Sequence, residues 1–259
     1  MPIVLALLLA AGVVASSQTG TPAGDSIQVV RVAAASDLQF ALEDIIARLK
    51  EQRPSLRIEV VYGSSGNIHA QLRQRAPYDV FLSADIGYPR DLVSRGVGSE
   101  ADLFTYATGR LVVWTPEASK LAVEREGLRA LEGAARIAIA NPRHAPYGRA
   151  AEAAMRRAGL WERVSARLVL GENVAQTAQF VQSGAADVGV IAKSLAVASG
   201  LRNGRYWEVP EQMHPPLIQG GVILPWARSR TGAMRFRDFL VSADGRRILA
   251  AYGFGAPPR

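Results

Sequence analysis

Cysteine is absent from this chain of 259 residues, and histidine occurs only three times, as His69, His144 and His214. The absence of cysteine excludes disulfides, thiolate catalysis and cysteine-ligated zinc or iron–sulfur centres. The histidines are far apart in the sequence and lack metal-ligand spacing. The chain also has no G-x-S-x-G elbow, no Walker A loop and no G-x-G-x-x-G after a strand. We therefore expect a protein that is not an enzyme and that needs no cofactor.

Charged residues make up only 20% of the chain, with a net charge of +7. The arginines are spread over the whole length instead of forming a basic tail, and no RNA-binding signature is present. Solvated helix faces explain most of them, so we expect no nucleic-acid partner. A positive field of this kind also favours the capture of an anion.

The apolar run at residues 3–14 is too short to span a membrane. With small residues at 13 and 15 it predicts a secretory signal peptide over residues 1–15, although no Lys or Arg precedes it. The alternative is a buried N-terminal strand or helix. Residues 16–26 are small and polar, which predicts a flexible leader. Without cysteine no lipobox exists, so the expected product is periplasmic, exported, soluble and not lipid-anchored.

Strand and helix patterns alternate along nearly the whole chain. Short apolar runs predict buried strands at residues 28–35, 79–84, 136–140 and 187–192. Apolar residues at helical spacing follow, for example over residues 38–49. This order predicts an α/β protein with mostly parallel sheets flanked by helices. The length suits two lobes, with one crossing near 104–110 and a return near 215–222, although periodicity alone does not show that the chain returns to its first lobe.

Four strand-to-helix junctions could hold a ligand, because open α/β sheets bind ligands beyond the carboxyl ends of their strands. The junctions are Ser36 after the first strand, GSSGN at 63–67, Tyr147 at the start of a helix behind Pro146, and Val174. A helix N-terminus offers unpaired N–H donors and positive potential, so several together would bind an anion without Lys or Arg. Taken singly, each junction is also ordinary helix capping.

Six segments, in this order, resemble motifs of the periplasmic molybdate-binding proteins of ABC transporters: VAAASDLQFAL, VVYGSSGNIHAQL, APYDVFLSADIGYPRDL, FTYATGRLVVW, IAIANPRHAPYGRAAEAAM and LVLGENVAQTAQFVQSGAADVGVIAKS. The resemblance extends from about residue 28 to AYGF at 251–254. It implies a type II periplasmic binding fold, with two α/β lobes, two crossover strands and one oxyanion in the cleft. The lobes would be residues 27–105 plus 222–259, and residues 106–221. A monomer and a partner permease in the membrane are also implied.

The resemblance further implies the residues that hold the oxyanion. Ser36 and Ser65 match hydroxyl donors that also give their backbone N–H, while Tyr147 and Val174 match main-chain donors at helix starts. Asp37 matches a further main-chain donor of close relatives. Molybdate would be held through its oxygens, and the metal atom would contact no protein atom.

Two positions depart from the simplest donor set. A carboxylate at Asp37 would repel a dianion but would meet the proton of monohydrogen phosphate, so we expect it to turn away and serve the helix dipole or a local cap. Some family members place a tyrosine hydroxyl where this chain has Ala192. That contact is absent here or replaced, with Tyr147 as the candidate.

Other ligands and one other activity stay open. Sulfate, like molybdate, only accepts hydrogen bonds, so cavity size must separate the two. Tungstate is nearly the same size as molybdate, and the sequence does not rank them. Phosphate is a further alternative. An exported hydrolase is the remaining class, suggested by His69 four residues after Ser65.

Overall fold

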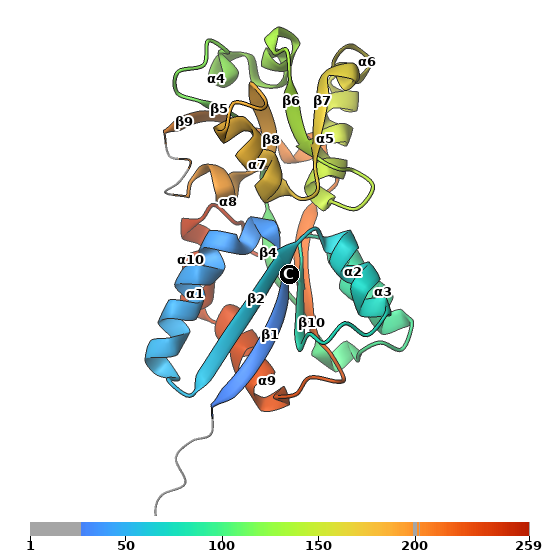
Figure 1. The fold of residues 1–259 in the computed structure, drawn as a ribbon, viewed down its shortest axis with the longest axis vertical. Helices are drawn as coiled ribbons and strands as arrows, with labels where there is room; N and C mark the ends of the chain where they lie inside the picture. Colours follow the sequence, from blue (N-terminus) through green and yellow to red (C-terminus); the bar gives the residue numbers. More distant parts are fainter. Residues whose placement is uncertain (1–26, 199–200, 202, 259) are drawn as a thin grey trace, which may run out of the picture.

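The structure is a computed structural model that describes residues 27–198, 201 and 203–258. The predicted signal peptide and leader therefore lie outside the described residues. Within them the strands form two five-stranded sheets, ordered β2-β1-β3-β10-β4 and β7-β6-β8-β5-β9. Each sheet with its helices forms one lobe, and the two lobes follow each other along the long axis of the molecule (Figure 1).

The first lobe is a sheet with helices on both faces. Its strands are β1 (Gln28–Ala35), β2 (Leu56–Gly63), β3 (Val80–Ser83), β4 (Leu103–Gly109) and β10 (Leu217–Ile223). Its helices are α1 (Gln39–Gln52), α2 (Ser65–Arg73), α3 (Gly87–Ser94), α9 (Arg230–Leu240) and α10 (Ala243–Ala251). Alternate residues of β1 point to opposite faces. Val32 packs in the core with α1, α9 and α10, while Ala33 packs with α2 and α3. Burial on both faces explains the continuous apolar run from Val32 to Ala35 in the second half of β1.

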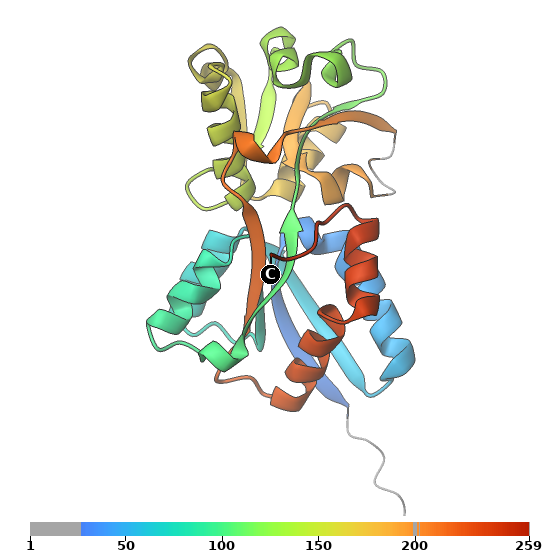
Figure 2. The same cartoon turned by 180° about the vertical axis from the view of Figure 1, so that it is seen from behind.

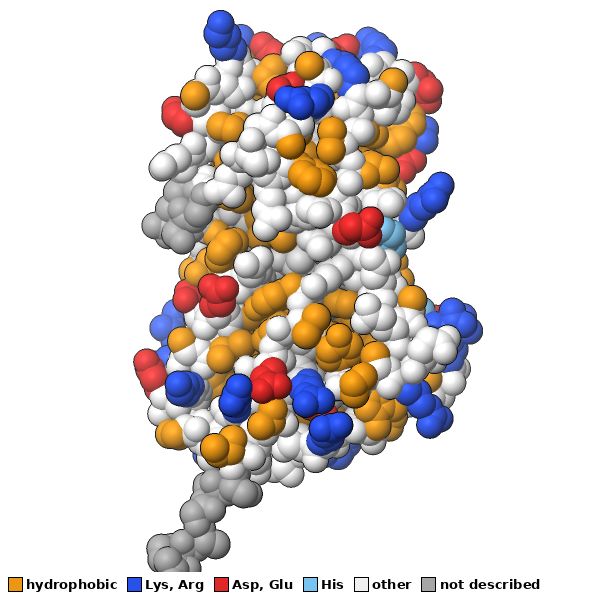
Figure 3. Space-filling model, in the orientation of Figure 1, with side chains coloured by type: hydrophobic (Ala, Val, Ile, Leu, Met, Phe, Trp, Pro, Cys, Tyr) orange, Lys and Arg blue, Asp and Glu red, His pale blue; other side chains and the backbone are white. Residues whose placement is uncertain are grey.

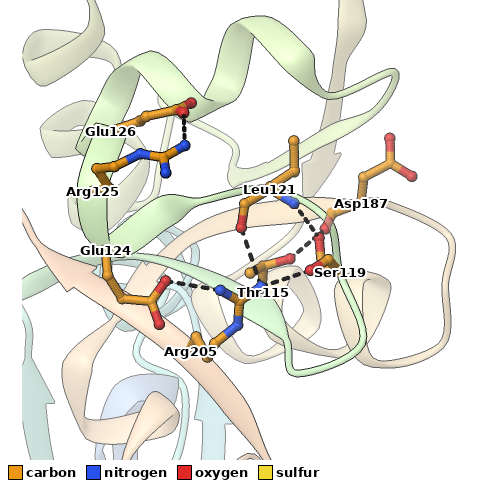
Figure 4. A network of polar contacts seen from close by, with 8 residues as sticks. All are labelled: Thr115, Ser119, Leu121, Glu124, Arg125, Glu126, Asp187 and Arg205. Carbon is orange, nitrogen blue, oxygen red and sulfur yellow. Dashed lines mark hydrogen bonds and ion pairs between the residues drawn. The ribbon is translucent and has the colours of Figure 1, made fainter.

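The second lobe repeats this arrangement. Its strands are β5 (Leu111–Pro116), β6 (Ile137–Ala140), β7 (Leu168–Gly171), β8 (Val188–Ala192) and β9 (Gly204–Glu208). Its helices are α4 (Val123–Glu126), α5 (Pro146–Arg157), α6 (Trp161–Val164), α7 (Val174–Gln182) and α8 (Lys193–Ala196). Arg205 fastens β9 to the segment after β5, since its guanidinium bonds Glu124 at 3.0 Å and the carbonyl of Ser119 at 2.6 Å (Figure 4).

Two segments of the chain connect the lobes. β4 leads directly into β5, and β9 is followed by the return along β10 (Figure 2). β4 and β10 pair with each other in the first sheet, and β5 and β9 pair in the second. These crossing strands supply the antiparallel pairs, while β1 and β6 pair in parallel with both of their neighbours. The predicted lobe boundaries at 105/106 and 221/222 fall inside β4 and β10, and the division of the chain stays a prediction.

Among the described helices, none combines the length and the apolar character needed to cross a membrane.

Candidate functional site

A small cavity lies where the two lobes meet, and all five predicted ligand residues line it. The lining consists of Ala35, Ser36, Asp37, Gly63, Ser64, Ser65, Ala84, Ala145, Pro146, Tyr147 and Val174. The cavity is small, with a volume of about 10 Å³, which is room for roughly one water molecule. Each of the five predicted residues is at most 4% exposed. The structure thus brings together residues that are up to 138 positions apart in the sequence (174 − 36).

The two serine hydroxyls are oriented by main-chain donors. Ser65 Oγ accepts a hydrogen bond from the N–H of Ala84 at 3.0 Å, and Ser36 Oγ accepts one from the N–H of Ala175 at 3.3 Å. A hydroxyl that accepts one bond still has its own proton to donate. Both serines can therefore act as donors toward the cavity.

Three helices begin at the cavity wall. Ser65 and Val174 are the first residues of α2 and α7, and Tyr147 is the second residue of α5. N–H groups in the first turn of a helix have no partner within their own helix. The side chain of Asn173 caps α7 by accepting from the N–H of Gln176 at 3.0 Å. This cap leaves the N–H of Val174 unused, and the helix ends add positive potential.

The cavity wall is poor in charge. Among the described residues that line it, none is Lys or Arg, and Asp37 is the single acidic residue. On the face shown in Figure 3, the Lys and Arg side chains lie mainly over the outer parts of the two lobes. An anion in this cavity would therefore be held by neutral N–H and O–H donors.

The Asp37 carboxylate was expected to turn away from the cavity and serve its own helix start, and in the structure it also bonds residues beyond its own segment. Its Oδ2 accepts a hydrogen bond from the hydroxyl of Tyr147 at 3.0 Å and another from the side-chain amide of Gln219. Its Oδ1 is buried without a hydrogen-bond partner among the described residues. Burial raises the pKa of the Asp37 carboxyl to about 6, and hydrogen bonds from Gln219, from Tyr147 and from the main-chain N–H groups of Asp37 and Leu38 oppose that rise. The carboxylate thus joins the two lobes.

Ala192 has no hydroxyl, and Tyr147 was the candidate to replace the tyrosine hydroxyl of other family members. The hydroxyl of Tyr147 donates to Asp37 in the structure, so it is not free to take that role. Ser194, two residues further along the chain, instead donates to the main-chain oxygen of Asp37 at 2.7 Å. Both contacts join the second lobe to the same short segment after β1.

Further contacts between the lobes surround the cavity. The N–H of Gly66 bonds the carbonyl oxygen of His144 at 2.9 Å. Arg149 bonds Asp85 at 2.7 Å and the hydroxyl of Tyr88 at 2.9 Å. A Cβ atom at Gly66 would lie 2.6 Å from that carbonyl oxygen, so a side chain there would keep the lobes apart.

The structure does not place His69 as a base for Ser65. His69 Nε2 lies 2.8 Å from Asp91 Oδ2 on the outer helices of the first lobe. A different histidine, His144, has its Nδ1 2.9 Å from Ser64 Oγ, and its Nε2 is 3.5 Å from Glu172. Ser64 is the N-cap of α2, however, and accepts from the N–H of Asn67. The arrangement is therefore a capped helix that touches the opposite lobe.

Three residues that shape this site were not predicted from their sequence context: Gln219, Ser194 and His144. Gln219 is fully buried within the apolar run of β10, and a polar residue in such a run is a signal that could have identified it. In the described part of the chain, no group of three or more His, Asp or Glu side chains is arranged to hold a metal ion.

Known proteins share this sequence pattern and this two-lobed arrangement. The family described as bacterial extracellular solute-binding proteins matches residues 30–255. The chain belongs to this family. The molybdate-binding protein ModA of Rhodobacter capsulatus is 32% identical over 227 residues, which cover 88% of each chain. ModA of Azotobacter vinelandii is 33% identical over 228 residues, 87% of this chain and 89% of that protein.

A solved structure gives the same result for the fold. The periplasmic molybdate-binding protein of Azotobacter vinelandii superposes with a TM-score of 0.82 at 30% identity, covering 88% of this solute-binding protein and all of that chain. The predicted two-lobed periplasmic binding fold and the resemblance on which it was based are confirmed.

Proposed function

We propose that this solute-binding protein is an exported receptor that binds molybdate, and with it tungstate, between its lobes and delivers the ion to an ABC permease. The observation that carries the proposal is the convergence of donors without a cation. The hydroxyls of Ser36 and Ser65 and the N–H groups of Tyr147 and Val174 line one cavity. Each charge-assisted hydrogen bond contributes about 1.5–3 kcal/mol, so several together offset the desolvation of a dianion. The relatives named for molybdate support this choice.

Phosphate is the second candidate, and one observation favours it. The unpartnered Oδ1 of Asp37 is a buried acceptor beside the cavity, and it could accept the proton of monohydrogen phosphate. Against phosphate, the other oxygen of Asp37 is already bonded to Tyr147 and Gln219, on the side of the strands that connect the lobes.

The remaining parts of the proposal concern the state of the protein. We infer that it acts as a periplasmic monomer without a lipid anchor, a cofactor, a nucleic-acid partner or enzyme activity. The absence of cysteine, which a lipid anchor of the lipobox type needs, supports the unanchored form. The buried N-cap role of Ser64 argues against a serine nucleophile.

A competitive titration tests the ligand. We expect calorimetry to show tight binding of molybdate and tungstate, weak binding of sulfate and little binding of phosphate. Sulfate is smaller, so its hydrogen bonds would be stretched in a pocket that fits the larger ion. Phosphate binding more tightly than molybdate would replace the first candidate with the second.

Removal of either serine hydroxyl should weaken binding without affecting the fold. We expect Ser36→Ala and Ser65→Ala each to lower the affinity for molybdate by about 1–3 kcal/mol, since each loses one hydrogen bond to a charged ligand. Isothermal titration measures the loss, and Ser94→Ala on the outer helix α3 is the matched control. If both cavity variants bind as the wild type does, the ligand lies elsewhere.

A further inference from the structure

A buried hydrogen-bonded group joins both lobes to a strand that connects them. It consists of Asp37 after β1, Tyr147 at the start of α5 and Gln219 on β10. The side-chain amide of Gln219 donates to Asp37 and lies 3.3 Å from the hydroxyl of Tyr147, which donates to the same carboxylate oxygen. All three residues are at most 2% exposed. Solvent therefore does not compete for these bonds.

The second connecting strand leaves room for this group. Gly109 ends β4, and a Cβ atom there would collide with the hydroxyl of Tyr147 and lie 2.9 Å from the amide nitrogen of Gln219. The hydroxyl thus occupies a space formed by β4 and β10 together. In this structure α5 lies against β10, and the hydroxyl of Tyr147 fills that space.

We propose that Asp37, Tyr147 and Gln219 form a closure latch, in which Asp37 is a positioning residue that fixes Tyr147 and thereby the N-terminus of α5 over the ligand. The inference rests on the proposed function, because it assigns a role in closing on the oxyanion. Asp37 acts through Tyr147 and need not touch the ion. Gln219 does not line the cavity, so the latch predicts an effect of its side chain on binding that direct contact with the ligand would not give.

The surroundings of the latch make it sensitive to protons. The titratable groups that face Asp37 are Tyr147 and Tyr106, and burial raises the pKa of both tyrosines above its usual range. Lys193, on the neighbouring helix α8, is bound to Glu208 at 2.6 Å. Burial raises the pKa of Asp37 to about 6, and a bound dianion would raise it further. Closing on the ligand therefore takes up a proton, and affinity falls as pH rises through this range.

Calorimetry with molybdate on five variants tests the latch. Tyr147→Phe keeps the main-chain N–H but loses the latch hydroxyl, and Gln219→Leu removes its second donor. We expect each to weaken binding about tenfold or more. The double variant should bind molybdate about as tightly as the weaker-binding single variant, because either change alone already breaks the latch. Asp37→Leu should behave like these, whereas Asp37→Asn keeps an acceptor and should restore affinity to within a fewfold of the wild type.

The pH profile separates a latch from a merely structural role. From pH 6 to pH 8 the wild-type affinity should fall severalfold, and Asp37→Asn should show no such fall. Asp91→Asn, which removes a carboxylate at the outer surface of the first lobe, should follow the wild type. Wild-type affinity in both Tyr147→Phe and Gln219→Leu would overturn the latch, and so would an unchanged pH profile in Asp37→Asn.

Failure of the proposed function would look different. If the wild type binds no molybdate, the ligand assignment is wrong, and the latch is then judged by thermal unfolding of the ligand-free protein. A carboxyl whose folded pKa is raised stabilises the fold at low pH and less as pH rises through about 6. The unfolding temperature of Asp37→Asn minus that of the wild type should therefore increase from pH 4 to pH 7. An unchanged difference would overturn the latch.

Discussion

Val174→Pro should reduce the affinity for molybdate about 100-fold or more and leave the fold intact. Proline removes the N–H that we propose as a ligand donor and places its ring carbon where that proton pointed. The fold tolerates the change because Val174 is the first residue of α7, a position that favours proline. The preceding Asn173 is already extended, with φ −153° and ψ 174°, as a residue before proline prefers.

The matched control is Val174→Ala, which changes the side chain but keeps the N–H. We expect it to bind molybdate within about threefold of the wild type, since the side chain makes no polar contact. Circular dichroism and thermal unfolding establish that both variants are folded, and calorimetry measures their affinity. A folded proline variant with wild-type affinity would show that α7 does not donate to the ligand through this group.

Gly66→Ala should nearly abolish binding while the ligand-free protein becomes no less stable. The new Cβ atom would lie 2.6 Å from the carbonyl oxygen of His144 and 2.9 Å from its Cα atom, both in the backbone of the opposite lobe, while its contact within the first lobe, 2.8 Å, is with the far end of the Tyr88 side chain, which can shift. The lobes could then not approach as closely, and donors from the second lobe would miss the ion. Within α2, alanine is favoured over glycine by roughly 0.5–1 kcal/mol, which acts in the opposite direction on stability.

Because Gly66→Ala is expected to lower the affinity but not the stability of the ligand-free protein, loss of binding in this variant cannot be explained by unfolding. Titration calorimetry should show a loss of about 100-fold or more, while the unfolding temperature without ligand stays equal or rises. Gly133→Ala, in the second lobe and facing the flexible side chain of Leu121 at 3.2 Å, is the control and should bind normally. Wild-type affinity in Gly66→Ala would mean that binding does not need the approach of Gly66 to His144.

The sequence predicted the elements whose burial is uniform. β8 and the second half of β1, from Val32 to Ala35, are covered on both faces, so they are continuous apolar runs, and the serine that follows β1 marks the change to a helix. β4 and β9 were not predicted from periodicity, because partly exposed residues alternate irregularly in β4 and fill the whole of β9. That the chain returns to the first lobe along a second crossover strand was expected only because the chain resembles a known family.

The site was predictable in its members and less so in its geometry. Capping chemistry and the family resemblance pointed to Ser36, Ser65, Tyr147 and Val174, and the structure brings them to one cavity. The orientation of Asp37 was not predictable, because its partner Gln219 is 182 residues away in the sequence. Neither an aspartate nor a glutamine by itself indicates that the two side chains will be hydrogen-bonded. Contacts of that kind depend on how the lobes close, which local sequence does not encode.

The paired connections between the lobes limit how they can move. β4 and β10 lie next to each other in one sheet, and β5 and β9 lie next to each other in the other. Two adjacent connections restrict how the lobes can move relative to each other, so we expect closure as a hinge rotation about one axis. A pair of labels across the mouth, one on each lobe, would then follow the entire swing with one coordinate.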